Sequence, residues 1–137
     1  MDYGVTSMVA PLRRVAVRAP APESDFARAH WAQPLDIDLL LVQHAAFVAL
    51  LRRLGCEVLE LPPLEGLPDS CFTYDPAFTV SDGVITLRAA KEVRVGEGER
   101  LAADLAAAGV PTIGALSGMA TADGGDMFWL DDVTLAV

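Results

Sequence analysis

The chain has 137 residues, which is enough for one modest domain with a hydrophobic core. Its content of 53% hydrophobic and 21% charged residues is typical of a folded protein and excludes a disordered one. The formal net charge of −9 argues against a nucleic-acid partner, because phosphate binding needs clusters of Lys and Arg, and it mildly favours a cationic small molecule.

The N-terminus gives no sign of a targeting signal. Met1–Gly4 has neither the basic n-region nor the apolar h-region of a secretory leader. Cys56 and Cys71 are therefore expected to be free thiols in a reducing, cytoplasmic setting. No apolar stretch is long enough to cross a bilayer, because Leu39–Val42 is followed at once by polar residues.

The first half of the chain predicts a strand, a helix and a second strand. Val15–Val17 is expected to form a strand that ends at the prolines of Ala19–Pro22. A long amphipathic helix follows, with Asp36 as its N-cap and Gly55 just beyond its C-terminus. Cys56–Leu61 then alternates as a half-buried strand. The apolar face of the expected helix consists of Ile37, Leu40, Leu41, His44, Phe47, Val48 and Leu51.

The second half predicts a hairpin, a helix and a strand in that order. Phe72–Val80 is expected to be a strand, Ser81–Gly83 a turn, and Val84–Leu87 the hairpin partner. A helix is expected over about Glu97–Ala108, because apolar residues recur on one face and a glycine follows. Val110–Ile113 begins the next strand. The fold class predicted by this order is α/β.

The order suggests a strand–strand–helix–strand unit that is used twice. A third unit opens at Met127–Leu130 and Val133–Val137, with Asp131–Asp132 as the turn between them. Repeat units of this kind rarely stand alone, so two units and a fraction indicate that more units should follow. We therefore expect this sequence to be part of a longer chain.

Two short acidic stretches carry the candidate chemistry. They are Pro68–Pro76 (PDSCFTYDP) and Asp123–Asp126 (DGGD). A carboxylate can accept paired N–H donors from a planar guanidinium group. From the residues alone, Asp75 before Pro76 can equally form a simple turn, and the glycine run a tight turn before a strand. A calcium loop fits the second stretch less well, because the alternating Asp or Asn ligands and the terminal Glu are missing.

Taken in order, these motifs resemble those of the guanidino-group-modifying (pentein) superfamily, which includes dimethylarginine dimethylaminohydrolases, arginine deiminases and amidinotransferases. Pro68–Pro76 is similar to the family's Pro-Asp-Ser-x-Phe-x-x-Asp-Pro element, and Ala122–Asp126 to its Glu-Gly-Gly-Asp element. The resemblance extends from about Leu12 to Val137. It implies about two to two and a half ββαβ units of a five-fold pseudosymmetric α/β propeller. Residues 1–137 would then be the N-terminal part of a single, truncated domain.

The resemblance also implies roles for particular residues. Asp75 matches the carboxylate that binds the substrate guanidinium, and Asp69 matches a second substrate-binding acid. Phe72 matches an aromatic residue packed near the guanidino group. Asp123 matches the acid that holds the guanidinium and partners the catalytic histidine; it is usually Glu in the hydrolases and is Asp in the amidinotransferase branch. Tyr74 replaces a charged residue often found before the guanidinium-binding Asp, so recognition of the substrate's amino-acid end is left open.

The family's mechanism uses a cysteine that attacks the guanidino carbon and a histidine that handles protons. In the family both lie in later repeats, which correspond to positions beyond Val137. The residues of these types within the chain are not expected to be catalytic: Cys56, Cys71 and His44 are expected to be packed, and His30 to lie in a mobile loop. Asp126 matches a position that braces its loop. Asp25–Trp31 matches the place where the family keeps a loop over the active site.

The expected function is therefore that of one part of an enzyme. The enzyme would hydrolyse arginine or an arginine derivative to citrulline, or transfer an amidino group, through a Cys-amidino intermediate, and this chain alone would be inactive. The alternative is a non-catalytic module that binds a cationic ligand or supports assembly. A small guanidino substrate is the expected partner, without nucleic acid, membrane, cofactor or metal. A homo-oligomer, or association with the missing C-terminal half, is a further possibility.

Overall fold

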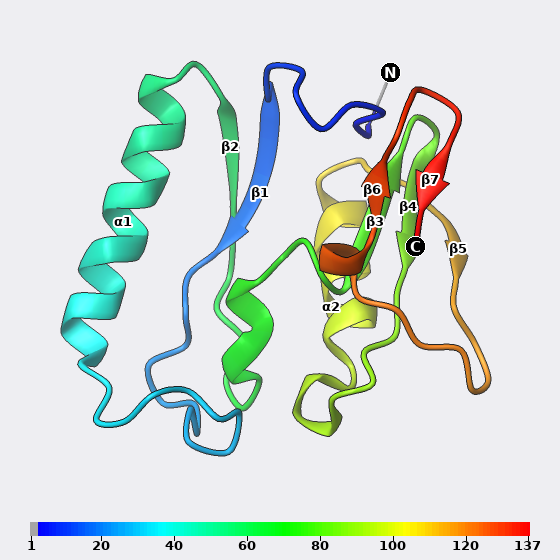
Figure 1. Cartoon of the computed structure of the whole chain (residues 1–137). Helices are drawn as coiled ribbons and strands as arrows, with labels where there is room; N and C mark the ends of the chain where they lie inside the picture. Colours follow the sequence, from blue (N-terminus) through cyan, green and yellow to red (C-terminus); the bar gives the residue numbers. More distant parts are fainter. Residues whose placement is uncertain (1–2) are drawn as a thin grey trace. The chain divides into compact units, whose positions relative to one another are not determined.

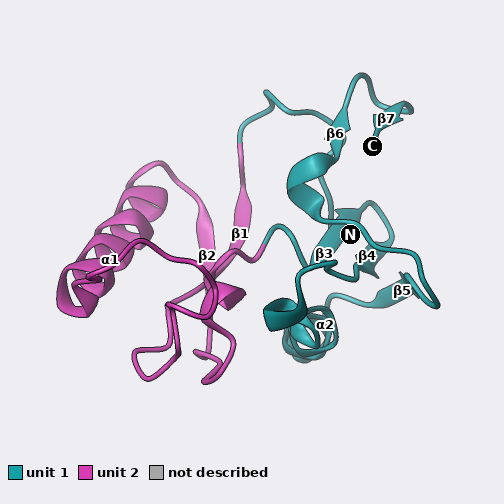
Figure 2. Ribbon diagram, turned by 60° about the horizontal axis from the view of Figure 1, so that its bottom comes forward, with its two compact units in different colours: residues 1–11, 74–137 teal, residues 12–73 magenta. Residues whose placement is uncertain are grey.

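The computed structural model describes residues 3–137, which divide into two compact units. Residues 12–73 form one unit, and residues 74–137 together with the N-terminal segment up to Pro11 form the other (Figure 2). The boundary at Thr73 and Tyr74 falls inside the first acidic motif. Each unit has its own secondary structure, and the two are considered in turn.

The unit of residues 12–73 is built on a parallel strand–helix–strand crossover. Strand β1 (Arg14–Arg18) pairs in parallel with β2 (Glu57–Leu61), with Arg14 opposite Glu57 and Arg18 opposite Leu61. Helix α1 (Ile37–Arg53) connects them and lies beside the strand pair (Figure 1). The predicted order of strand, helix and strand is confirmed.

The predicted ends of α1 are also confirmed. The carboxylate of Asp36 accepts a hydrogen bond from the backbone N–H of Leu39 at 2.9 Å, which satisfies one of the free donors of the first turn. Beyond Leu54, Gly55 adopts a φ of 89°, a left-handed conformation that ends the helix. The sequence therefore determines both ends of this helix locally.

The predicted apolar face of α1 is only partly buried. Val48 and Leu51 are buried and form a core cluster with Val17 of β1. Phe47 lies on the same face, where it lines a pocket together with Leu40 and His44, but it is 51% exposed. The buried part of the face is the part that packs against β1 and β2, where Val15 and Val58 adjoin the cluster.

The first acidic motif does not form the predicted strand from Phe72. Pro68–Cys71 is a short 3₁₀ helix (η1), and strand β3 (Ala77–Val80) begins only after Pro76. The N–H of Phe72 donates to the carbonyl of Asp69 at 2.9 Å, so local bonds replace a strand ladder here. Pro76, which has no N–H to donate, delays the strand further.

The other unit contains a complete strand–strand–helix–strand segment. Strand β3 pairs antiparallel with β4 (Gly83–Thr86), and β4 pairs in parallel with β5 (Thr112–Ala115). Helix α2 (Glu97–Ala107) connects β4 to β5, preceded by a 3₁₀ turn (η2) at Glu92–Arg94, and buries Leu101 and Leu105. This confirms the predicted hairpin and helix, although β5 begins two residues later than expected.

The C-terminal segment is a short hairpin. After a 3₁₀ turn at Gly124–Asp126 (η3), strand β6 (Phe128–Trp129) pairs antiparallel with β7 (Leu135–Ala136). The Asp131 carboxylate accepts the backbone N–H groups of Val133 and Thr134, which holds the pKa of Asp131 below its usual value. The predicted turn at Asp131–Asp132 is thus confirmed, with shorter strands. Within residues 3–137, no helix has the length and apolar character needed to span a bilayer.

Candidate functional site

The end of the first acidic motif packs directly against the second. The N–H of Gly124 donates to the backbone carbonyl of Asp75 at 3.0 Å, and the N–H of Gly125 donates to Oδ1 of Asp75 at 3.1 Å. A Cβ at position 124 would lie 2.1 Å from the carbonyl oxygen of Tyr74, so only glycine allows this approach. Asp75 and the DGGD turn, 50 residues apart in sequence, therefore form one structural element.

The guanidinium of a buried arginine, Arg94, forms an ion pair with the Asp75 carboxylate. Its Nη1 lies 2.7 Å from Oδ2 of Asp75, and its Nη2 and Nε lie 2.8 and 2.9 Å from Oε2 of Glu97. The side chains of Arg94 and Glu97 are only 8% and 2% exposed. Burial by itself lowers the pKa of Arg94, but the hydrogen bonds to Glu97 and Asp75 outweigh it and raise that pKa. Both oxygens of Asp75 are thus engaged, by Arg94 and by Gly125.

Sequence reasoning did not identify Arg94 and Glu97. Their signal is an Arg and a Glu three residues apart across the start of a helix, a spacing at which side chains meet. That pattern is frequent on exposed helices, where it has no special meaning. Only the burial of both side chains distinguishes this pair.

Asp123 is an acid of this unit whose pKa is raised. Its Oδ1 is buried and has no hydrogen-bond partner among the described residues. Burial raises the pKa of Asp123; Arg94 opposes that shift, while the negative charges of Asp75 and Asp126 add to it. A cation placed beside Asp123 would satisfy an acceptor that is otherwise unpaired. Such an arrangement is suited to holding a positively charged group.

Tyr74 precedes Asp75, and Asp126 ends the DGGD turn; both side chains are exposed. Tyr74 is 43% exposed, and burial together with the charge of Asp75 raises its pKa. The backbone N–H of Asp126 closes the turn on the carbonyl of Asp123 at 3.0 Å, and its side chain is exposed. Tyr74 therefore presents a protonated hydroxyl at neutral pH, and the backbone of Asp126 holds the loop in shape.

In the unit of residues 12–73, Asp69 is held by a tryptophan. The indole Nε1–H of Trp31 donates to Oδ1 of Asp69 at 2.7 Å, and Asp69 is only 3% exposed. The Trp31 ring lies against the ring of Phe72, with centroids 5.6 Å apart, and against Phe26 at 5.0 Å. Phe72 itself is 49% exposed. The two predicted site residues of this unit, Asp69 and Phe72, thus share Trp31 as a neighbour.

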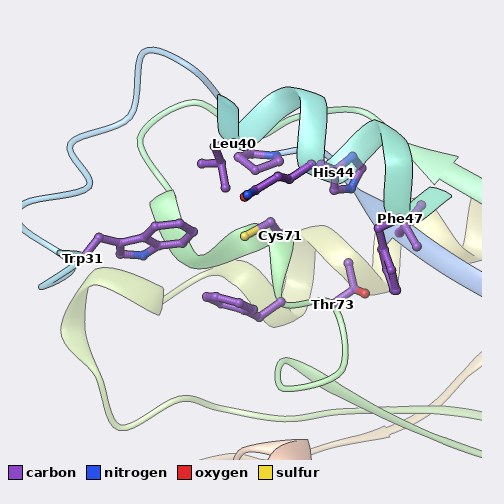
Figure 3. Close-up of a pocket in the computed structure, with 10 residues that line it drawn as sticks. Trp31, Leu40, His44, Phe47, Cys71 and Thr73 are labelled. Atoms are coloured by element: carbon purple, nitrogen blue, oxygen red, sulfur yellow. The ribbon is translucent and has the colours of Figure 1, made fainter. Parts of the chain in front are cut away.

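A pocket of about 270 Å³ opens beside these residues (Figure 3). Figure 3 shows Leu40, His44 and Phe47 of α1 on one wall, with Trp31 and Cys71 facing them. The full lining is Val17, Pro20, Trp31, Leu40, Gln43, His44, Phe47, Cys71, Phe72 and Thr73. The pocket is mainly apolar, and its polar side-chain groups are a thiol, an imidazole, an amide, the Thr73 hydroxyl and the Trp31 indole N–H.

The cysteines and histidines take up different positions. Cys56 and Cys71 are both free thiols, as the sequence predicts, and both are half-buried. His30 is exposed in the loop before α1, with a φ of 67°, whereas His44 is half-buried. Among residues 3–137, no three His, Cys, Asp or Glu side chains group in a way that could hold a metal ion.

The four predicted site residues fall into two pairs. Asp75 and Asp123 belong to the unit of residues 74–137, where the DGGD turn joins them. Asp69 and Phe72 belong to the unit of residues 12–73, where the backbone of η1 joins them. Each pair has a partner that sequence reasoning missed: Arg94 in the first and Trp31 in the second.

Comparison with known proteins gives a consistent family. No protein-family profile matches the chain. The N(G),N(G)-dimethylarginine dimethylaminohydrolase of Pseudomonas aeruginosa is 33% identical over 89 residues, which cover 64% of this chain and 35% of that protein. The chain therefore spans about a third of the length of this curated relative.

Solved structures extend the match to most of the chain. A dimethylarginine dimethylaminohydrolase carrying a 4-chloro-2-hydroxymethylpyridine adduct is 27% identical with a TM-score of 0.71, covering 85% of this chain and 45% of that one. A variant of the Pseudomonas aeruginosa enzyme in complex with citrulline is 25% identical, also with a TM-score of 0.71, over 85% of this chain and 46% of that one.

A more distant structure supports the fold. Unliganded AgrE is 18% identical with a TM-score of 0.72, over 87% of this chain and 18% of its own. The mixed α/β fold of this protein thus matches both dimethylarginine dimethylaminohydrolase and AgrE. The sequence match, the structural matches and the two acidic motifs together support assignment of this chain to the guanidino-group-modifying (pentein) superfamily.

Proposed function

We propose that this chain is the N-terminal part of an enzyme that acts on the guanidino group of arginine or an arginine derivative, as a dimethylarginine dimethylaminohydrolase does. The observation that carries the proposal is the packing of the DGGD turn on Asp75, in which Asp123 keeps a buried Oδ1 without a hydrogen-bond partner among residues 3–137. The share of each relative that the chain covers supports its being one part of a longer protein. In that protein the ββαβ units would belong to a five-fold α/β propeller of which residues 1–137 form the first part.

The proposal assigns roles to the four acidic and aromatic residues. Asp75 and Asp123 bind the guanidinium, and Asp123 also aligns a histidine; Asp69 is a second substrate-binding acid. Phe72 packs near the guanidino group. Arg94 and Gly125 each take one acceptor site of Asp75, and the remaining lone pairs of its two oxygens are the ones that a substrate guanidinium would use. Carboxylates around the guanidinium keep it charged and its central carbon electrophilic.

The chemistry would use groups from the rest of the longer protein. A cysteine thiolate attacks the guanidino carbon and forms a C–S bond, which gives a tetrahedral adduct. The C–N bond to the departing amine then breaks, and the histidine supplies the proton that the amine takes. Water then adds to the remaining amidino carbon and gives one proton to the histidine. The C–S bond breaks as the C=O bond of citrulline forms, the second proton passes to solvent, and the thiolate is released.

Two other functions remain as candidates. Amidino transfer is favoured by Asp123, because the resemblance links Asp at this position to the amidinotransferase branch. A non-catalytic module that binds a cation or supports assembly is favoured by the pocket and by the unpaired carboxylate oxygen. Both retain the cation-binding role of the acids.

The activity is tested in a protein in which this sequence is continued by its native downstream residues. With dimethylarginine as substrate, we expect citrulline, and we expect Asp75→Asn to abolish its formation while the circular dichroism spectrum is unchanged. The same change at exposed Asp82 serves as the matched control. Wild-type turnover by Asp75→Asn would rule out the assigned role.

Calorimetry on the 137-residue chain separates the alternatives. Saturable binding of arginine or dimethylarginine without citrulline formation favours a binding module, and absence of binding favours a fragment of an enzyme. Absence of citrulline from the longer protein, together with transfer of the amidino group to an added amine, favours the transferase.

A further inference from the structure

We infer that Trp31 is a ligand-positioning residue, which orients the Asp69 carboxylate and forms, with Phe72, the aromatic wall of the guanidino-ligand site. This inference rests on the proposed function, because that function makes Asp69 and Phe72 substrate-binding residues. All three residues lie in the unit of residues 12–73.

Trp31 donates a hydrogen bond to the carboxylate of Asp69. A buried carboxylate needs donors, and Asp69 is only 3% exposed. The indole Nε1–H of Trp31 lies 2.7 Å from Oδ1, the short distance typical of a hydrogen bond to a charged acceptor. A tryptophan has a single N–H in a rigid ring, so this bond fixes the direction in which the carboxylate faces.

The Trp31 ring also packs against the rings of Phe72 and Phe26. The ring planes of Trp31 and Phe72 lie at an angle of 30°. The ring of Phe26 meets the ring of Trp31 edge to face, at 64°. Trp31 and Phe72 both line the pocket, so their rings form a continuous aromatic surface next to an acid. Aromatic faces attract cations, and tryptophan does so most strongly. One side chain thus combines an aromatic face with control of the neighbouring carboxylate.

The loop that carries Trp31 has hydrogen bonds of its own. The backbone N–H of Trp31 donates to the carbonyl of Phe26 at 3.0 Å, and that of Arg28 donates to the Asp25 carboxylate at 3.0 Å. Phe26 and Ala29 are 5% and 3% exposed, so side chains on both sides of this turn are packed. Trp31 is therefore placed by the loop and is not held only by Asp69.

The test compares two identical substitutions. The chain has two tryptophans, Trp31 and Trp129. Trp31→Phe keeps an aromatic ring but removes the N–H that Asp69 accepts. Trp129→Phe is the matched control, because the Nε1 of Trp129 has no hydrogen-bond partner among residues 3–137. Both variants also assign the two indole N–H signals in a nitrogen–proton NMR spectrum.

Arginine and dimethylarginine are then titrated into each protein. We expect the Trp31 indole signal to shift on binding while the Trp129 signal stays in place. We expect Trp31→Phe to weaken binding roughly tenfold, as for loss of one hydrogen bond to a charged group, and Trp129→Phe to leave affinity unchanged.

The outcomes distinguish failure of the role assigned to Trp31 from failure of the proposed function. If the wild type binds and Trp31→Phe binds equally well or more tightly, the inference is overturned while the proposed function stands. If no guanidino compound binds to the wild type or to the longer protein, both fail together. If Trp31→Phe does not fold, the wild-type titration decides: a shift of the Trp31 signal alone supports the inference, and an unmoved Trp31 signal at saturation overturns it.

Discussion

The guanidinium of Arg94 lies 2.7 Å from the carboxylate of Asp75, the residue assigned to bind a substrate guanidinium. Glu97 holds the other side of the same arginine at 2.8 Å, and neither Arg94 nor Glu97 is exposed. The structure thus contains an internal example of the interaction that the protein is proposed to make with its ligand. The stability of this unit and its ligand binding consequently share residues.

Replacement of Arg94 should be strongly destabilising. Arg94→Met leaves the Glu97 carboxylate buried without its cation, and breaking a buried pair in this way costs about 3 kcal/mol or more. Urea unfolding of the variant and the wild type measures the loss of unfolding free energy.

The double variant Arg94→Met with Glu97→Met checks the cause. It removes both deeply buried charges and should recover more than half of the lost stability, because only Asp75, whose side chain is 25% exposed, is then left without its cation. Arg100→Met, at an exposed position of α2, is the matched control and should stay within about 0.5 kcal/mol of the wild type. No recovery in the double variant would contradict the buried-charge explanation.

Gly124→Ala should disrupt the joint between the two acidic motifs. The added Cβ would lie 2.1 Å from the Tyr74 carbonyl, so the turn must move and its bonds to Asp75 must lengthen or break. We expect a loss of more than about 2 kcal/mol of unfolding free energy, measured by denaturant titration. Gly114→Ala is the matched control, because the nearest atom to its added Cβ is 3.9 Å away. Equal stability of the two variants would show that the close approach is not required.

Ionisation of Asp123 should lower the stability of the folded chain. Its pKa in the folded state is raised above the ordinary 3.8, so the folded state holds this proton more tightly than the unfolded state does. The stability contributed by the proton is present below pH 3.8 and is lost as pH rises through the folded-state pKa. Asp123→Asn cannot ionise and should therefore gain stability relative to the wild type across that window.

Thermal unfolding at a series of pH values measures this difference. The melting temperatures of wild type and Asp123→Asn should differ least at low pH and should diverge, in favour of the variant, as pH rises. Asp82→Asn, at an exposed position, reports the effect of removing a surface charge alone. A wild type that is more stable than Asp123→Asn at neutral pH would contradict the predicted sign.

Loss of the N-cap should weaken α1. Asp36→Ala removes the carboxylate that accepts the Leu39 N–H at 2.9 Å, which should cost about 1 kcal/mol. Asp38→Ala removes an acid from the same turn without removing the cap, and it should cost only a few tenths of a kcal/mol. Helical circular dichroism during urea unfolding compares the two. Similar losses would mean that charge in the first turn, and not the cap, stabilises the helix.

Local features of the chain were predictable because their causes are local. The ends of α1 follow from Asp36 and Gly55, and the final turn follows from Asp131, which satisfies two backbone donors near it in sequence. The two acidic motifs were also visible in the sequence, and with them the family. In each case, the residues that decide the outcome lie within a few positions of one another.

The tertiary structure decided which groups these motifs meet. The pairing of Asp75 with Arg94, the fit of Gly124 against Tyr74, and the bond from Trp31 to Asp69 each join residues 19 to 50 positions apart. The strand expected from Phe72 also failed, because backbone bonds at η1 and Pro76 oppose it. Sequence patterns report propensity and periodicity, whereas burial and partner choice depend on chain segments that only folding brings together.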